Sequence, residues 1–89
     1  MQKATIFIEL LDEGARVFAP VQAEHLGGRY YKVLEHNQGE FYPRFAAGTY
    51  VLCLPTKLSR DELVPLAYCE VDKEEAEYMS KFYVKSFFV

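Results

Sequence analysis

The 89-residue chain lacks tryptophan, has only two cysteines, and has no apolar run near the roughly 18 residues of a membrane-spanning helix. Cys53 and Cys69 match neither a CxxC motif nor a zinc-ligand spacing. We therefore expect two buried thiols and no metal site. The first residues carry one lysine and early acids, unlike a secretory signal, so we expect a cytoplasmic location.

No nucleotide-binding, metalloprotease, serine-hydrolase or EF-hand motif occurs in the chain. A nucleophilic cysteine would need a histidine partner, and the available pairs join Cys53 or Cys69 to His25 or His36. Each cysteine lies among apolar residues of a predicted strand, which favours a structural role. We expect no enzyme, no catalytic residue and no cofactor. A small enzyme built from scattered acid–base groups is the less favoured alternative.

A positive charge excess is also missing, because the net charge is −3, and this argues against nucleic-acid binding. The charge is uneven along the chain. Residues 15–60 carry six basic and three acidic side chains, whereas residues 61–77 carry seven acidic side chains and one lysine. The acidic stretch could cap a basic surface, as in an immunity or antitoxin-like protein. Ordinary solvated surface is the simpler interpretation.

Aromatic residues, by contrast, are abundant, since seven Phe and seven Tyr make up 16% of the chain. Each ring can bury about 150–250 Å², so the first interpretation is that the rings fill a small core. The second is an aromatic surface that recognises a protein or peptide. The candidate binding residues are Tyr30, Tyr42, Tyr50, Arg29 and Arg44.

Alternation of apolar and polar residues predicts short strands separated by turns about every ten residues. The predicted strands are Ala4–Leu11, Ala15–Leu26, Arg29–Glu35, Thr49–Leu54 and Leu63–Val71. This pattern predicts a mainly β fold, a small antiparallel SH3-like barrel of about five strands.

Turns and prolines give finer predictions within this barrel. The Gly27–Gly28 hairpin should place His25 opposite Tyr30, with both histidines at solvated strand ends. Pro20 predicts an edge or a bulge, residues 55–62 a loop, and residues 63–71 a strand that pairs mainly after residue 65. Alternation also predicts that Cys53 and Cys69 share one core layer.

The last eighteen residues change character. Asp72 and Glu75 predict a capping box, followed by a short helix from Lys73 to Ser80. Residues 81–89 fit either a strand or a helical stripe, and a terminal strand is favoured. We treat 1–71 as the barrel domain and 72–89 as an extension packed on the same domain or on a partner subunit. Its apolar residues predict a homodimer interface formed by Phe82, Val84, Phe87, Phe88 and Val89.

Several segments resemble a group of small uncharacterised bacterial proteins. The group carries a V-aromatic-x-P-V-x-A-x-x-L-G segment, a Y-x-[IV]-L strand and an F-x-x-G-x-x-V-x-C strand. Here these correspond to residues 17–27, 31–34 and 45–53. The resemblance covers residues 15–71 at most and implies an SH3-like barrel and an accessory role, but no particular site residue. A non-catalytic binding module is therefore the leading hypothesis, with a homodimeric accessory protein or an immunity protein as alternatives.

Overall fold

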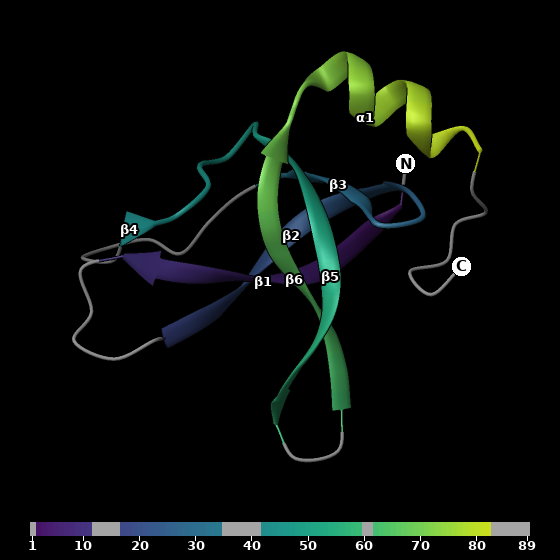
Figure 1. Cartoon of the computed structure of the whole chain (residues 1–89). Coiled ribbons are helices and arrows are strands. Elements are labelled where there is room, and N and C mark those ends of the chain that lie inside the picture. Colours follow the sequence, from purple (N-terminus) through teal and green to yellow (C-terminus); the bar gives the residue numbers. More distant parts are fainter. Residues whose placement is uncertain (1, 12–16, 35–41, 60–61, 83–89) are drawn as a thin grey trace.

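The computed structural model describes residues 2–11, 17–34, 42–59 and 62–82 (Figure 1). These residues form six strands and one helix. In chain order the elements are β1 (Lys3–Leu11), β2 (Val17–Gly27), β3 (Tyr30–Val33), β4 (Tyr42–Pro43), β5 (Tyr50–Ser59), β6 (Glu62–Val71) and α1 (Lys73–Ser80).

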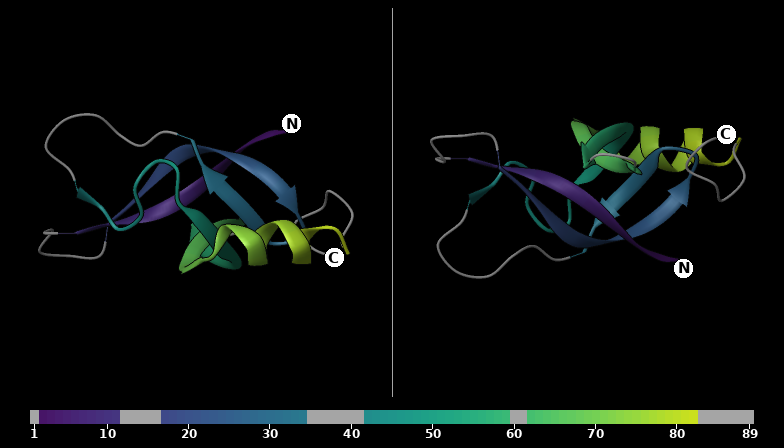
Figure 2. Two further views of the ribbon diagram at one scale, coloured as in Figure 1. Left: turned by 90° about the horizontal axis from the view of Figure 1, so that it is seen from above. Right: turned by 90° about the horizontal axis from the view of Figure 1, so that it is seen from below.

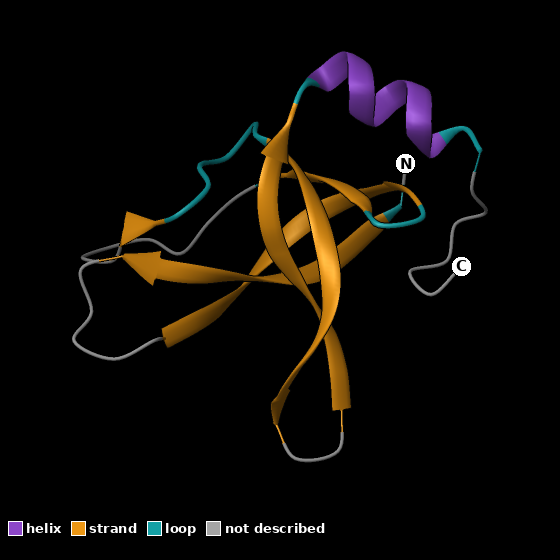
Figure 3. Cartoon of the chain, viewed as in Figure 1, coloured by secondary structure: helices purple, strands orange, loops and turns teal. Residues whose placement is uncertain are grey.

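Five strands close into a ring, because β1 pairs with β2 on one side and with β6 on the other. The ring order is β1, β2, β3, β5, β6, and β4 adds to the end of β1 outside the ring. All pairings are antiparallel except the short parallel contact between β1 and β6, where Phe7 registers with Leu66. The predicted mainly β barrel with a short C-terminal helix is confirmed (Figure 3).

The core consists mainly of small and branched side chains on the inner face of this ring. On β1, Ile6 and Ile8 are fully buried, while Phe7 between them is only half-buried on the outer side. The same alternation continues on β2, β3 and β5. The full core cluster is Ile6, Ile8, Val21, Ala23, Tyr31, Val33, Phe45, Val51, Cys53 and Ala67.

The predicted loop at residues 55–62 is wrong within the described part of the chain, because β5 runs to Ser59 and β6 starts at Glu62. The two strands pair along their whole length, and Pro55 lies opposite Pro65. Registered pairing of β3 with β5 ends at Leu52, so the outer edge of β5 needs no ladder donor at Pro55. Proline is tolerated at such edges. The β5–β6 ribbon therefore extends beyond the ring (Figure 1).

The two cysteines do not share a core layer. The register between β5 and β6 shifts so that Leu52 faces Cys69 while Cys53 faces Ala67, which leaves Tyr68 as an extra residue on β6. Such a bulge breaks the simple alternation of sides along a strand. Cys53 is fully buried, whereas Cys69 is only half-buried, and both are free thiols.

The hairpin register of β2 and β3 also differs from the prediction. His25 lies opposite Tyr31 rather than Tyr30, because the register shifts between His25 and Gly27. His25 lies on the inner side of β2 with Val21 and Ala23 and is 7% exposed, so the predicted solvated position is wrong for this histidine. His36 lies outside the described residues. Pro20 was predicted to mark an edge or a bulge, and the structure agrees with an edge. No β3 residue pairs with Pro20, and the pairing of β2 with β1 continues through Pro20 without a bulge.

Helix α1 has the predicted bounds and packs against its own barrel. Its N-cap is Asp72, but the Asp72 side chain makes no capping hydrogen bond, so that half of the predicted capping box is wrong. Ala76 and Ser80 are buried, and the helix contacts β2, β3 and β5. In both views of Figure 2 the end of α1 lies beside the end of β2. Residues 83–89, where a terminal strand was favoured, lie outside the described part.

Gly27 permits this close approach of the helix to the barrel, and its replacement gives a test of helix docking. A Cβ at Gly27 would overlap the backbone oxygen of Ser80. We expect Gly27→Ala to lower the free energy of unfolding by about 1–3 kcal/mol, as overpacking does. Amide hydrogen exchange should show early loss of protection in α1.

The matched control is Gly48→Ala, which adds a methyl group where no atom lies within 4 Å. Gly48 has a φ of 92°, so this change strains the backbone locally. It should nevertheless leave protection of the α1 amides unchanged relative to the barrel. Equal loss of α1 protection in both variants would contradict the docking role of Gly27.

Candidate functional site

The predicted binding residues separate into two groups in the structure. Tyr30 and Tyr50 are half-buried on the neighbouring strands β3 and β5, where Tyr50 registers with Lys32, whose Nζ lies 5.6 Å from the ring centre. Arg29 directly precedes β3. Arg44 instead follows β4, which pairs only with β1. Tyr42 belongs to β4, but its side chain lies outside the described residues.

Most of the described aromatic rings are on the outside of the ring of strands. Of nine described aromatic side chains, only Tyr31 and Phe45 are buried. Four are half-buried, and Tyr68, Tyr78 and Phe82 are exposed by 58%, 62% and 66%. The interpretation that the rings fill the core is therefore wrong for most of those described. The aromatic surplus is instead a property of the surface.

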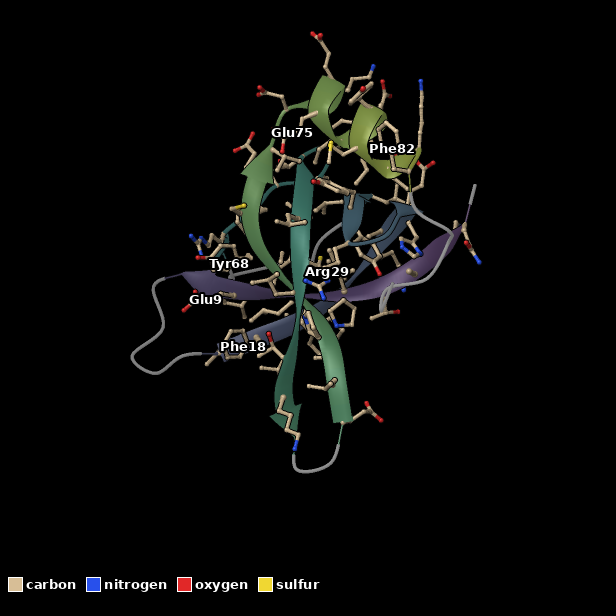
Figure 4. All side chains as sticks on the ribbon, turned by 45° about the vertical axis from the view of Figure 1, so that its right-hand side comes forward. Glu9, Phe18, Arg29, Tyr68, Glu75 and Phe82 are labelled. Carbon is tan, nitrogen blue, oxygen red and sulfur yellow. The ribbon has the colours of Figure 1, made fainter. Side chains whose placement is uncertain are left out.

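One set of these outer residues forms a row across three strands. Glu9 of β1 lies opposite Phe18 of β2. Phe7 of β1 registers with Leu66 of β6 in the parallel pairing. Two residues further along both strands, Tyr68 therefore lies beside Glu9, on the side away from Phe18. Figure 4 shows Tyr68, Glu9 and Phe18 in line on one side of the molecule. Phe18, Glu9 and Tyr68, together with Arg44 described below, are called the outer row.

Arg44 joins the outer row through Glu9. Its backbone N–H donates to the Glu9 carbonyl oxygen at 2.9 Å, and its Nη1 lies 3.9 Å from Glu9 Oε1. The guanidinium also sits 5.1 Å from the centre of the buried Phe45 ring. An ion pair this exposed, 47% for Arg44 and 24% for Glu9, contributes about 0–1 kcal/mol. The 47% exposed guanidinium of Arg44 can therefore contact another molecule at little cost to this ion pair.

Sequence reasoning missed most of this row, although the signal was present. Glu9 alternates with the apolar Ile8 and Leu10 in the first strand, and Tyr68 directly precedes Cys69, which was predicted to face the core. Sequence reasoning did not place Glu9 beside Tyr68, because the parallel contact between β1 and β6 joins residues about sixty positions apart. Of the predicted binding residues, only Arg44 belongs to the outer row.

A second group surrounds the turn between β2 and β3. The ring of His25 lies 4.5 Å from that of Tyr31 with 8° between the planes, and its Nε2 donates to the Gly28 carbonyl oxygen at 2.8 Å. The next residue, Arg29, accepts a 2.8 Å hydrogen bond from the Cys53 backbone N–H. Arg29 Nε is buried and has no hydrogen-bond partner. We call Arg29 with its supports His25, Tyr31 and Cys53 the Arg29 site.

The chemistry of the Arg29 site does not favour nucleophilic catalysis. Burial raises the pKa of the Cys53 thiol far above its usual range. Burial also raises the pKa of Tyr31, and the nearby Cys53 adds to this shift. Both groups keep their protons at neutral pH, and a protonated thiol is a weak nucleophile. Within the described ranges no three His, Cys, Asp or Glu side chains gather as a metal-binding set.

The end of α1 presents a further pair of exposed rings. Tyr78 and Phe82 pack edge to face, with their ring centres 5.2 Å apart and their planes at 76°. Phe82 is the one member of the predicted dimer interface within the described residues, and Val84, Phe87, Phe88 and Val89 lie outside them. The eight-residue α1 is far too short to cross a membrane, and the described residues include no helix that could.

Comparison of the chain with known proteins gave no match to a protein-family model, a curated protein or a solved structure.

The unequal burial of the two thiols leads to a labelling prediction. At pH 8, iodoacetamide should modify Cys69 in the folded chain and leave Cys53 unmodified, because Cys53 is buried and keeps its proton. Both should react in denaturing urea. Peptide mass spectrometry after timed quenching measures the two rates separately. Equal rates in the folded protein would contradict the register shift that places Cys53 inside and Cys69 outside.

Proposed function

We propose that the chain is a non-catalytic binding module that recognises a protein or peptide partner through the outer row. The observation that carries this proposal is the 58% exposure of Tyr68, beside the half-buried Phe18 and the Glu9–Arg44 pair. Tyrosine rings are enriched at binding hot spots, since they offer a large contact area with few rotatable bonds.

The charges of the outer row support a polypeptide ligand. Glu9 and Arg44 place both signs of charge beside the two rings, which fixes the orientation of a partner that carries complementary charges. A nucleic-acid backbone would meet a carboxylate in the middle of the row and a net charge of −3 on the whole chain. A peptide with apolar and charged side chains suits this pattern better.

Selection from a phage-displayed library of random short peptides on the immobilised chain tests the proposal. We expect enriched peptides, and their affinity can be measured by calorimetry with purified protein. Tyr68→Ala should weaken binding by about tenfold or more, since removing a hot-spot ring costs about 2 kcal/mol.

The matched control is Tyr78→Ala, which removes an equally exposed tyrosine on α1. It should leave the affinity of the same peptides within about twofold, well under 1 kcal/mol. Failure to enrich any peptide, or equal affinity of the Tyr68→Ala variant, would refute recognition through the outer row.

A second proposal is that the chain acts as a homodimer that associates through its C-terminal extension. The supporting observation is the exposed pair of Tyr78 and Phe82 at the end of α1, where the sequence predicts the interface. Exposed apolar groups of this kind often mark subunit contacts.

Sedimentation equilibrium tests the dimer proposal. We expect a dimer at micromolar concentration and dissociation on Phe82→Asp, because a charge in an apolar contact is costly to desolvate. The control Tyr68→Asp places the same charge on the outer row and should leave the association unchanged. A wild-type chain that sediments as a monomer at high micromolar concentration would overturn the proposal.

A further inference from the structure

The side chain of Arg29 contains a buried hydrogen-bond donor, Nε, that no described residue accepts from. The ion pair found among the described residues joins Arg44 to Glu9, not Arg29. Buried polar groups in proteins nearly always have a hydrogen-bond partner, and an arginine guanidinium stays charged. A buried, unpartnered Nε on a charged guanidinium therefore indicates a place for an acceptor that the described residues do not supply.

The backbone of Arg29 is held in place on both sides of its turn. The Cys53 backbone N–H donates to the Arg29 carbonyl oxygen, and His25 Nε2 donates to that of Gly28, both at 2.8 Å. The His25 ring is in turn stacked on Tyr31, a buried residue of β3. This support fixes the backbone of Arg29 before any ligand arrives, which lowers the entropy cost of binding.

The surroundings of Arg29 are largely apolar. The hydrogen bond from the Cys53 backbone places Arg29 beside Cys53 of β5. At this position Cys53 lies opposite Ala67 of β6, and both side chains face the core. Two residues further along each strand, Pro55 lies opposite Pro65 on the same side, and both prolines are half-buried. Figure 4 shows the Arg29 side chain beside the crossing of β5 and β6. Arg29 thus lies where the ring of strands opens onto the β5–β6 ribbon.

We propose that Arg29 is the anchor of an anion site that takes a single carboxylate group. A planar carboxylate can accept two parallel hydrogen bonds from Nε and a terminal nitrogen of the guanidinium. Its one negative charge is balanced by the one fixed positive charge. A phosphate carries nearly two negative charges, and the excess would lie uncompensated beside the prolines. This site is separate from the outer row and does not depend on the proposed function.

The Nε–Hε group of Arg29 reports directly on this site in the NMR spectrum of the ¹⁵N-labelled full chain. Its signal is assigned by its loss in Arg29→Lys. Titration with sodium acetate should move the wild-type signal downfield and saturate, while sodium chloride at equal ionic strength should not. The Nε–Hε signal of Arg44, which already pairs with Glu9 at an exposed position, is the internal control and should not saturate.

Two further arms distinguish the sources of the carboxylate. A short peptide with a free C-terminus is compared with the same peptide as its amide. Saturation by the free acid at lower concentration than acetate identifies a chain terminus as the ligand, and saturation by acetate alone identifies a small organic acid. Absence of a saturable shift with both acids, an equal response to chloride, or a stronger response to inorganic phosphate would overturn the proposal. A poorly folded variant would affect only the assignment of the signal, because the titration is carried out on the wild-type chain.

Discussion

Closure of the small ring of strands is the constraint on which the other features depend. Because β1 pairs with both β2 and β6, five strands enclose a narrow interior. Side chains such as Ile6, Ile8 and Val51 fill it, and an interior of this size leaves little room for rings. A chain with fourteen aromatic residues must therefore keep many of them elsewhere. The aromatic surface is thus a consequence of closure, and it makes a binding role physically reasonable.

The bulge on β6 leaves only one of the two thiols in the core. Without the extra residue at Tyr68, strict alternation would place Cys69 inside, in line with Cys53. The bulge instead leaves Cys69 half-buried. Tyr68 follows the buried Ala67 and is exposed, next to the β1 strand that carries Glu9.

Local sequence patterns predicted the strands and the helix well, but they predicted less well which side chains face the core. The strand with Ile6 and Ile8 and the helix after Asp72 follow from alternation and from acids in the first turn, which act over a few residues. The cross-strand partner of His25 and the side of Cys69 were predicted wrongly, because each depends on a one-residue shift in pairing that local periodicity does not encode. Arg44 could not be assigned to Glu9, because this requires knowing which strand β4 joins.

The prolines of the ribbon suggest a break in strand pairing when the sequence is considered alone, yet both lie within paired strands of the structure. The sequence predicted a loop from Pro55 and strand pairing mainly after Pro65, whereas the two prolines lie opposite each other within the β5–β6 ribbon. Registered pairing of β5 with β3 ends at Leu52, so a missing donor at Pro55 costs little on that side. Pro55 also leaves the outer edge of β5 without an N–H donor at this point, which disfavours pairing with a further strand. A ligand at this end of the barrel is therefore better held by side chains. Arg29, fixed at the start of the ribbon with a buried Nε that has no partner among the described residues, is the side chain placed to do so.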